Sequence, residues 1–314
     1  MSKFPQSPKA TVEKMRTDLT KESVLSARSV QSYCQCTSTM IDLLTANNRN
    51  DMPWKIDASD IKFLLDKFTE KGFTVSTRRG YMAAIRKWTT HYGNNIVKDM
   101  KIRWPADMRP NADWLTTHQA EKLITLPKSP MQELIVHCEL CLGMRRIEVL
   151  RLKPNSFSGT YVDVLGKGMQ GGKPRRVPYH RDTENVLRRY VNYRDALINL
   201  ARSQFPVSTK VPETLLMWSR GNRLYEYSKK GVSIDAQLKS LGPDIGYRDI
   251  SNHTLRRTFG REMYRSLSKE SGDLCLPVIA KIMGHDSLEQ CMKYLGLDMD
   301  DMTRAMNKFA LGMG

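Results

Sequence analysis

Residues 251–294 read SNHTLRRTFGREMYRSLSKESGDLCLPVIAKIMGHDSLEQCMKY, and this stretch decides the architecture of the second half of the chain. Its apolar residues recur at helical spacing, which predicts helices over residues 254–267, 277–283 and 287–294. The pattern places His253 and Arg256 at the start of the first helix, Gly284-His285 after the second, and Tyr294 at the end of the third. Three neighbouring helices therefore present two histidines, an arginine and a tyrosine.

A second group of polar residues lies upstream. A helical stripe of Leu134, Cys138, Cys141 and Leu142 is expected to end at Gly143, so Arg145 of Gly143-Met144-Arg145-Arg146-Ile147-Glu148 should lie just past a helix. Residues 160–164 and 175–179 are rich in β-branched and aromatic residues around a glycine-rich turn, which predicts a hairpin with Lys167 near its tip. A long helix is expected over residues 186–200. The predicted fold of this half is mainly α with a small β-sheet.

The composition points to a polyanionic partner. The chain has 50 lysines and arginines against 33 acidic residues, a formal net charge of +17, which favours nucleic acid. Six cysteines in 314 residues give no disulfide framework, and no secretory segment precedes them, so an intracellular location is expected. No stretch approaches the roughly 18 apolar residues that a membrane span requires. Double-stranded DNA is the expected partner.

The N-terminal half is predicted to be helical after an arm. Residues 1–24 show little apolar periodicity and are assigned to a flexible basic arm. Helical stripes follow over residues 30–44, over 61–68 after Asp57-Ala58-Ser59-Asp60, and over 81–92 after Thr74-Val75-Ser76-Thr77. Trp104-Pro105 and Arg109-Pro110 then break the periodicity. We assign residues 25–102 to a helical DNA-binding domain, 103–113 to a linker and 114–314 to a second domain.

In order and spacing, these motifs resemble the catalytic domain of the tyrosine recombinases, the phage-integrase family of site-specific DNA recombinases. The resemblance rests on Gly143-Met144-Arg145 with Glu148, Gly166-Lys167-Gly168 before Arg176-Val177-Pro178, His253-x-Leu255-Arg256, and Gly284-His285 with Tyr294. Ser76-Thr77 leading into Tyr81-Met82-Ala83-Ala84-Ile85-Arg86 is similar to the family's SAM-like core-binding domain, so the likeness runs from about Ser29 to Tyr294. It implies an enzyme that breaks and rejoins DNA strands.

The residue types also suit that chemistry. Cutting DNA without a metal or nucleotide requires a nucleophile that preserves the energy of the phosphodiester, which Tyr294 can do by forming a phosphoryl ester. Charge builds up on the phosphate oxygens in the transition state, and guanidinium groups bind such oxygens through paired hydrogen bonds, so Arg145 and Arg256 are expected to hold the phosphate. The resemblance implies Lys167 as the general acid for the departing 5′ hydroxyl, and His253 and His285 as groups that orient the phosphate or move protons. No metal or other cofactor is expected.

Several assignments have rivals. Arg146 competes with Arg145, although a glutamate three residues after Arg145 favours the latter. The long, glycine-rich hairpin keeps Lys173 as an alternative general acid, and Arg257 stands where many family members have a histidine. Cys138-x-x-Cys141 lies on an apolar stripe, which favours buried thiols over a zinc site. The residues assigned to DNA contact are Arg79, Arg86, Lys87, Arg146, Arg257 and Lys173.

The tail after Tyr294 predicts one more amphipathic helix, built on Met302, Ala305, Met306 and Phe309. It is expected to dock on its own domain or, as the resemblance implies, on a neighbouring protomer of a DNA-bound tetramer. The expected function is strand exchange through a 3′-phosphotyrosyl bond, in integration or excision of a mobile element, with accessory DNA-bending proteins as candidate partners. The alternatives are a chromosome-dimer-resolving recombinase, a type IB topoisomerase-like enzyme, and a DNA-binding protein that does not cut. The expected location is the cytoplasm, at the nucleoid, or the host cell of such an element.

Overall fold

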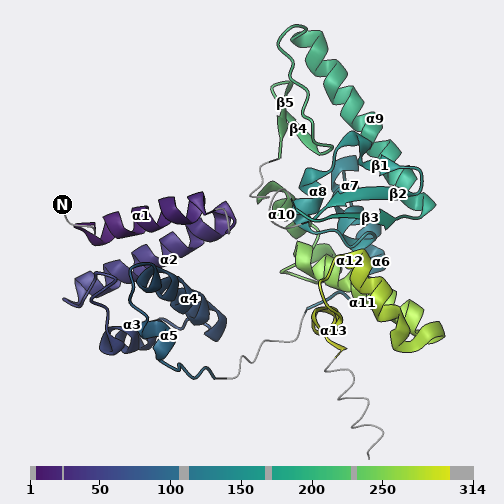
Figure 1. The fold of residues 1–314 in the computed structure, drawn as a ribbon. Helices are drawn as coiled ribbons and strands as arrows, with labels where there is room; N and C mark the ends of the chain where they lie inside the picture. The colour runs from purple at the N-terminus through teal and green to yellow at the C-terminus, as the bar shows by residue number, and fades with distance from the viewer. Residues whose placement is uncertain (1–4, 23–24, 106–112, 167–171, 228–231, 298–314) are drawn as a thin grey trace, which may run out of the picture. The chain divides into compact units, whose positions relative to one another are not determined.

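The computed structural model describes residues 5–22, 25–105, 113–166, 172–227 and 232–297 (Figure 1). The contacts within the chain divide it into two units, Met1–Arg109 and Pro110–Gly314. None of the helices described is both long and apolar enough to cross a membrane.

The first unit is helical throughout the part that the structure describes. Its helices are α1 (Pro8–Lys21), α2 (Ala27–Ala46), α3 (Ala58–Glu70), α4 (Val75–His91) and α5 (Ile96–Asp99). The apolar stripes expected for α2, α3 and α4 form its core, and Trp88 and Phe68 are among its largest fully buried side chains. Local sequence explains where two helices begin: Asp57 and Asp60 form a capping box on α3, and the Thr74 hydroxyl caps α4 by accepting from the Thr77 amide.

The flexible arm predicted for residues 1–24 is wrong over most of its length, because residues 8–21 form α1. Val12, Met15 and Leu19 recur at helical spacing and are buried in the core of the first unit. The Trp88 indole N–H donates to Thr11 Oγ1 (2.9 Å) and the Tyr92 hydroxyl donates to the Thr11 carbonyl (2.7 Å). These contacts fix α1 on α4, so the polar composition of the segment reflects only its outer face.

The second unit is built around a buried central helix, α7. Its helices are α6 (Thr117–Thr125), α7 (Pro130–Leu140), α8 (Arg146–Arg151), α9 (Arg181–Gln204), α10 (Val232–Lys239), α11 (Asn252–Ser271), α12 (Leu276–Met283) and α13 (Leu288–Leu295). Helices α6, α8, α9, α10 and α11 all contact α7. The side chains of α7 from Leu134 to Leu140 are buried, which makes it the core of the unit.

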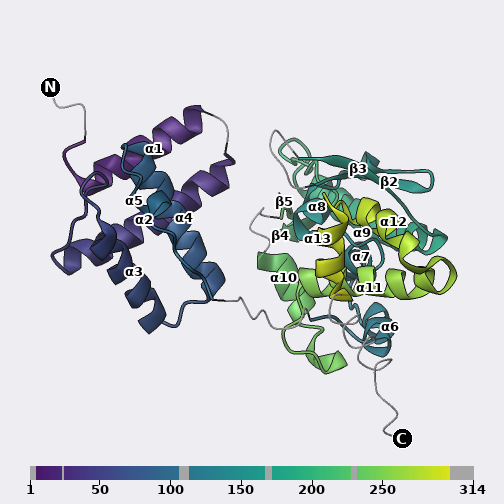
Figure 2. The same cartoon turned by 60° about the horizontal axis from the view of Figure 1, so that its bottom comes forward.

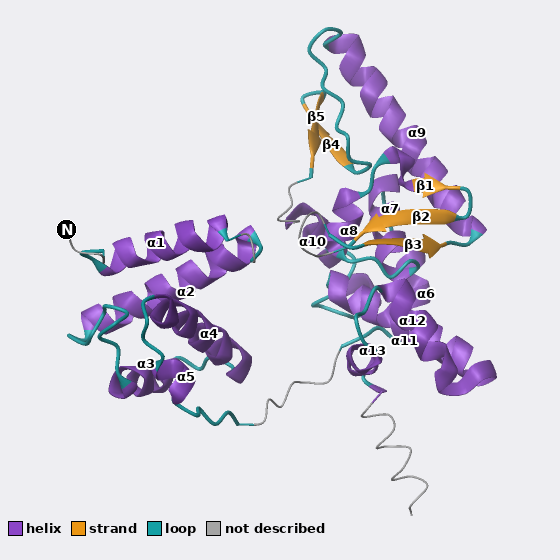
Figure 3. Ribbon diagram, viewed as in Figure 1, coloured by secondary structure: helices purple, strands orange, loops and turns teal. Residues whose placement is uncertain are grey.

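Two small antiparallel sheets complete this unit (Figure 3). The first joins β1 (Phe157–Ser158), β2 (Tyr161–Leu165) and β3 (Pro174–Pro178), and the second joins β4 (Met217–Arg220) and β5 (Arg223–Glu226). The predicted hairpin is confirmed as β2–β3, in which buried Val162 lies opposite buried Val177. The prediction of a mainly α fold with a small sheet is confirmed, whereas β4, β5 and α10 were not predicted.

The three helices expected in residues 251–294 are confirmed as α11, α12 and α13, which pack on one another (Figure 2). Gly260 allows this packing, because a Cβ there would lie 2.6 Å from Leu295 Cδ2 and 2.9 Å from Met283 Sδ. Leu295 and Met283 are themselves fully buried. The helix predicted in the tail lies in residues 298–314, outside the described residues.

Candidate active site

Arg145 is placed by a tight connection between α7 and α8. Gly143 has φ +60°, a left-handed conformation that favours glycine, and a Cβ there would overlap the Phe259 ring. Two residues later, Arg145 is the N-cap of α8, and its backbone N–H donates to Glu148 Oε2 at 2.7 Å. The glycine therefore lets α7 approach α11 closely, and the capping interaction orients Arg145 at the start of α8.

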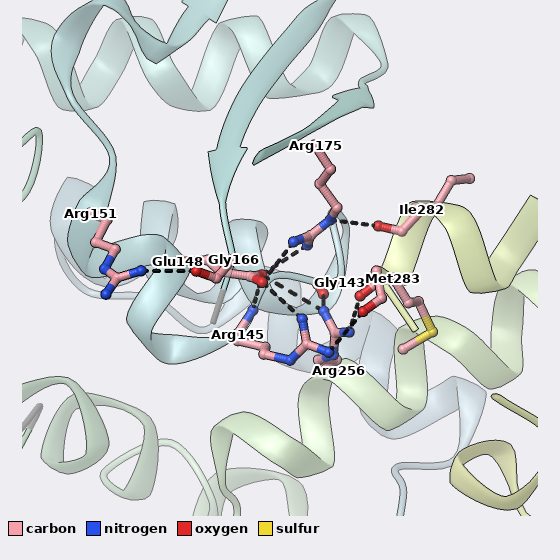
Figure 4. Close-up of polar contacts among 10 residues, drawn as sticks. Gly143, Arg145, Glu148, Arg151, Gly166, Arg175, Arg256, Ile282 and Met283 are labelled. Atoms are coloured by element: carbon pink, nitrogen blue, oxygen red, sulfur yellow. Dashed lines mark hydrogen bonds and ion pairs between the residues drawn. The ribbon is translucent and has the colours of Figure 1, made fainter. Parts of the chain in front are cut away.

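Glu148 is a fully buried carboxylate that holds arginines from three elements (Figure 4). Arg175 binds it through two hydrogen bonds, Nη1 to Oε1 at 2.6 Å and Nη2 to Oε2 at 2.8 Å. Arg145 Nη1 donates to Oε1 at 2.9 Å, and Arg256 Nη1 lies 3.8 Å from Oε2. Burial on its own raises the pKa of Glu148, but the hydrogen bond and charge of Arg175, together with Arg145 and Arg256, outweigh it and hold the pKa below its ordinary value. The carboxylate therefore stays ionised and links β3, α8 and α11.

Arg256 is one of the most deeply buried side chains of the chain, at 1% exposure. Its Nη1 donates to the Gly143 carbonyl and its Nη2 to the Met283 carbonyl. Burial, and after it the positive charge of the nearby Arg145, lower the pKa of Arg256 to about 10. The guanidinium is therefore still charged at neutral pH. Arg145 Nη2 also donates to the Gly284 carbonyl at 3.2 Å. Both arginines are thus fixed between the end of α7 and the end of α12.

Tyr294 and His285 lie next to these arginines. Their rings meet edge to face with centroids 5.0 Å apart, and the guanidinium carbons of Arg256 and Arg257 lie 5.9 and 5.4 Å from the centre of the Tyr294 ring. The Tyr294 hydroxyl and His285 Nδ1 are buried atoms that lack a well-formed hydrogen bond to the residues described. These two groups are therefore available for a ligand.

Burial sets the protonation states of both groups. It raises the pKa of Tyr294, although Arg256 and Arg257 oppose the rise, so the phenol is protonated at neutral pH. Burial, reinforced by Arg256 and Arg145, lowers the pKa of His285 to about 4, so the imidazole is neutral. The site therefore combines a protonated phenol and a neutral imidazole with fixed cations.

The other residues of the second unit that are predicted to act in catalysis or DNA contact lie at different places in it. His253 lies in the first turn of α11, where loss of solvent and then the charges of Arg257 and Arg256 lower its pKa. Lys167 lies outside the described residues. Lys173 pairs with Asp286 at 2.5 Å on the surface, and Arg146 pairs with Asp235 of α10 at 2.5 Å. The assignment of these residues to catalysis or DNA contact stays a prediction.

On α4, Arg79 and Arg86 are exposed and Lys87 is half-buried. Arg79 also stacks on Trp104, with its guanidinium carbon 5.7 Å from the ring centre. The exposed cations lie on the opposite side of the helix from buried Ile85 and Trp88. Their assignment to DNA contact stays a prediction as well.

Arg175 is the residue that sequence reasoning missed. Besides binding Glu148, its Nε donates to the Ile282 carbonyl at 2.9 Å, which ties β3 to the end of α12. A signal was present, because Arg175 is two residues from Val177 and so shares the inward face of β3. Its partner Glu148 lies 27 positions away, and no local pattern connects the two.

Comparison with known proteins identifies the chain. The model of the phage integrase family matches residues 113–300, more than half of the sequence. The chain belongs to the phage integrase family. The matched stretch of this tyrosine recombinase contains every candidate catalytic residue.

Two relatives and one solved structure agree with this assignment. The tyrosine recombinase XerC of Pelobacter propionicus is 27% identical over 53% of this chain and 47% of its own length, so the match spans about half of that protein. XerC of Roseiflexus castenholzii is 25% identical over 91% of this chain and 88% of its own length. A lambda integrase tetramer bound to a Holliday junction matches the fold with a TM-score of 0.60 at 14% identity, covering 91% of this chain and 76% of that one.

The recombinase brings its candidate groups together from four separate positions in the fold. Arg145 precedes α8, Arg256 lies on α11, His285 follows α12, and Tyr294 lies on α13. Two fixed guanidinium groups can bind an anion beside the Tyr294 hydroxyl. The arrangement is suited to transferring a phosphoryl group to the phenol oxygen.

Proposed function

We propose that this recombinase cleaves one strand of duplex DNA with Tyr294 as the nucleophile. The phenol oxygen attacks the phosphorus and loses its proton, the bond from phosphorus to the 5′ oxygen breaks, and a 3′-phosphotyrosyl ester forms. Attack by a 5′ hydroxyl of another strand reverses these steps and releases Tyr294. The bond energy is kept throughout, so no nucleotide is consumed.

Arg145 and Arg256 hold the phosphate in this proposal. Hydrogen bonds to the carbonyls of Gly143, Met283 and Gly284 fix their positions, so little reorganisation is needed when charge develops on the phosphate oxygens. The same positive field stabilises the phenolate and counteracts the pKa rise that burial imposes on Tyr294. Neutral His285 can accept a proton or orient the phosphate.

Of the remaining assignments, Lys167 lies outside the described residues, whereas Lys173 and His253 lie within them. Lys167 donates the proton to the departing 5′ hydroxyl, with Lys173, which directly precedes β3, as its rival. Lys173 pairs with Asp286, next to His285 in the sequence, so the end of the β2–β3 hairpin approaches the site. His253 assists from the first turn of α11.

The observation that carries the proposal is a buried tyrosine hydroxyl that lacks a well-formed hydrogen bond to the residues described and lies beside two hydrogen-bonded arginines, fully buried Arg256 and partly exposed Arg145. A core tyrosine of purely structural role normally satisfies its hydroxyl, as Tyr190 does by donating to the Leu215 carbonyl at 3.1 Å. The Tyr294 hydroxyl instead lies among cations and lacks a hydrogen bond of good geometry to the residues described. An incoming phosphate satisfies both the cations and the hydroxyl.

The test is covalent trapping. Wild type, Tyr294→Phe and a control, Tyr161→Phe on the exposed face of β2, are incubated with supercoiled DNA in the presence of chelator, denatured with detergent and run on a gel. We expect DNA-linked protein with wild type and Tyr161→Phe and none with Tyr294→Phe, with the link at the 3′ end of the nick. An adduct that persists in Tyr294→Phe identifies a different nucleophile. Tight DNA binding without any adduct favours a DNA-binding protein that keeps the fold.

On the same basis we propose duplex DNA as the substrate, assembly as a tetramer on it, and integration or excision of a mobile element as the biological role. The likeness to the lambda integrase tetramer supports the assembly and the role. The excess of basic residues and the exposed cations of α4 support DNA binding. A crosslinking experiment with and without DNA tests the tetramer, which is expected only when DNA is present.

A further inference from the structure

The β4–β5 ribbon has a surface that the active site does not use. In its register, Trp218 lies opposite Tyr225 and Arg220 lies opposite Arg223. Side chains alternate along a strand, so these four residues share one face of the ribbon. The two aromatic rings stack with centroids 4.8 Å apart and are 37% and 40% exposed, and both arginines are exposed as well.

The arginine pair is electrostatically unfavourable by itself. Like charges directly opposite each other on paired strands destabilise the pair. Within the part of the chain that the structure describes, no carboxylate forms an ion pair with Arg220 or Arg223. An anion placed between the two guanidinium groups converts this repulsion into attraction.

The ribbon is held rigidly enough to act as a binding platform. Two strands alone are marginally stable, but this pair is anchored to the end of α9. Asn222 Nδ2 donates to Gln204 Oε1 at 2.7 Å, and the Arg223 guanidinium carbon lies 5.4 Å from the centre of the Phe205 ring. The turn residues Gly221 and Asn222 have φ +55° and +57°, as in the tight turns that favour strand pairing. Figure 1 shows the ribbon beside α9.

We propose that this face is a further DNA-contacting surface, which binds the sugar–phosphate backbone of duplex DNA away from the reacting phosphate. The inference rests on the proposed function, because it takes the same DNA as its ligand. Guanidinium groups bind phosphate oxygens through paired hydrogen bonds, and the stacked Trp218 and Tyr225 present a flat apolar surface to deoxyribose. A polyanion suits the opposed arginines better than a protein partner, since each successive phosphate meets a cation. The contact adds affinity and orientation without reading sequence.

The experiment measures how DNA affinity depends on salt in the full-length protein, with a fluorescent random-sequence duplex as the probe. Each lost phosphate contact lowers the slope of log affinity against log salt by about 0.9. The double variant Arg220→Ala/Arg223→Ala is therefore expected to lower the slope by about 1.8. The control, Arg188→Ala/Arg202→Ala, removes two exposed arginines of α9 and should leave the slope unchanged. Arg220→Lys/Arg223→Lys should restore it, because lysine keeps the charge.

The possible outcomes distinguish the ribbon proposal from the proposed function of the catalytic site. If wild type shows steep salt dependence and the ribbon variant matches it, or if the control falls by as much, the ribbon proposal is overturned while the proposed function stands. If wild type itself binds without salt dependence, both are overturned. In the supporting case the ribbon variant still forms the Tyr294 adduct at low salt, because neither arginine belongs to the active site. A variant that fails to assemble yet keeps the full slope identifies a protein interface and overturns the proposal.

Discussion

At the residue scale, Arg145 and Arg146 are chemically identical neighbours with different surroundings. Arg145 is fixed by Glu148 and the Gly284 carbonyl, whereas Arg146 pairs with Asp235 at the side of the site. Arg145→Lys is expected to slow cleavage by about 10² to 10³, because lysine cannot make the paired contact with phosphate. Arg146→Lys is the matched control and should lose less than about tenfold, since an ion pair with Asp235 survives. Single-turnover cleavage of nicked duplex measures both, and equal losses contradict the assignment.

The lowered pKa of His285 predicts how the stability of the folded chain depends on pH. Its pKa is lowered from 6.5 to about 4 in the folded chain, so folding favours the neutral ring. The contribution of neutral His285 to the free energy of unfolding is fully present above pH 6.5. It is lost as the pH falls from 6.5 towards 4, because the unfolded chain then binds the proton more tightly. The melting temperature of wild type should therefore fall more steeply across this range than that of His285→Gln, by about 2–4 °C for each kcal/mol of linkage. Parallel curves contradict a neutral, half-buried imidazole at His285.

The sequence located the candidate catalytic residues better than the residue that holds them in place. Arg145, Arg256, His285 and Tyr294 fall in short motifs, so their spacing predicted them, and the structure places them together. The bidentate bond between Arg175 and Glu148 depends on how β3 packs against α8. Such a contact is set by the tertiary fold, and local periodicity carries no information about it.

At the scale of elements, α1 is the helix whose prediction failed. Val12, Met15 and Leu19 are the only buried apolar residues of this helix, and its other residues are mostly polar, so its apolar periodicity is weak. The core that completes it comes from α2 and α4, which a reading of the segment alone does not see. The β4–β5 ribbon was missed for a similar reason, because its strands are four residues each and keep one face exposed.

A substitution at Met15 tests whether α1 is part of the folded first unit. Its side chain is fully buried, so Met15→Ala is expected to destabilise the first unit by about 2–5 kcal/mol. Arg16→Ala, at an exposed neighbouring position, should change stability by less than about 0.5 kcal/mol. Hydrogen exchange of the α2 and α4 amides reports on this unit separately from the second. A flexible arm would give no increase in exchange for either variant.

A substitution at Gly260 tests how α11 positions α13, the helix that carries Tyr294. An added methyl group would meet Leu295 and Met283, so Gly260→Ala should cost about 1–3 kcal/mol and displace α13 with Tyr294. Cleavage should then fall even where the protein remains folded by thermal melting. Gly80→Ala in α4 is the control, because its added methyl group meets nothing within 4 Å and alanine favours helix by about 0.5–1 kcal/mol. Normal cleavage by folded Gly260→Ala would show that close packing at this point is dispensable.

At the scale of the whole molecule, the question is whether each chain contains its own complete site. The Tyr294 ring packs against His285, Arg256 and Arg257 of the same chain. Leu295, next to Tyr294, is fully buried, so α13 is anchored beside these residues. We therefore expect a tyrosine to attack the phosphate held by its own arginines.

Mixing two inactive variants tests this expectation. Tyr294→Phe lacks the nucleophile and Arg145→Lys lacks a phosphate-binding arginine, so with Tyr294 acting within its own chain no mixture contains a complete site. The mixed proteins should form no more adduct than either variant alone. Wild type mixed with Tyr294→Phe is the control, and it should retain adduct from the wild-type chains in proportion to their number. A gain of adduct in the mixture of variants would mean that α13 leaves its own chain in the assembled complex and donates Tyr294 to a neighbour, because only an exchange of tyrosines can unite an intact nucleophile with an intact pair of arginines.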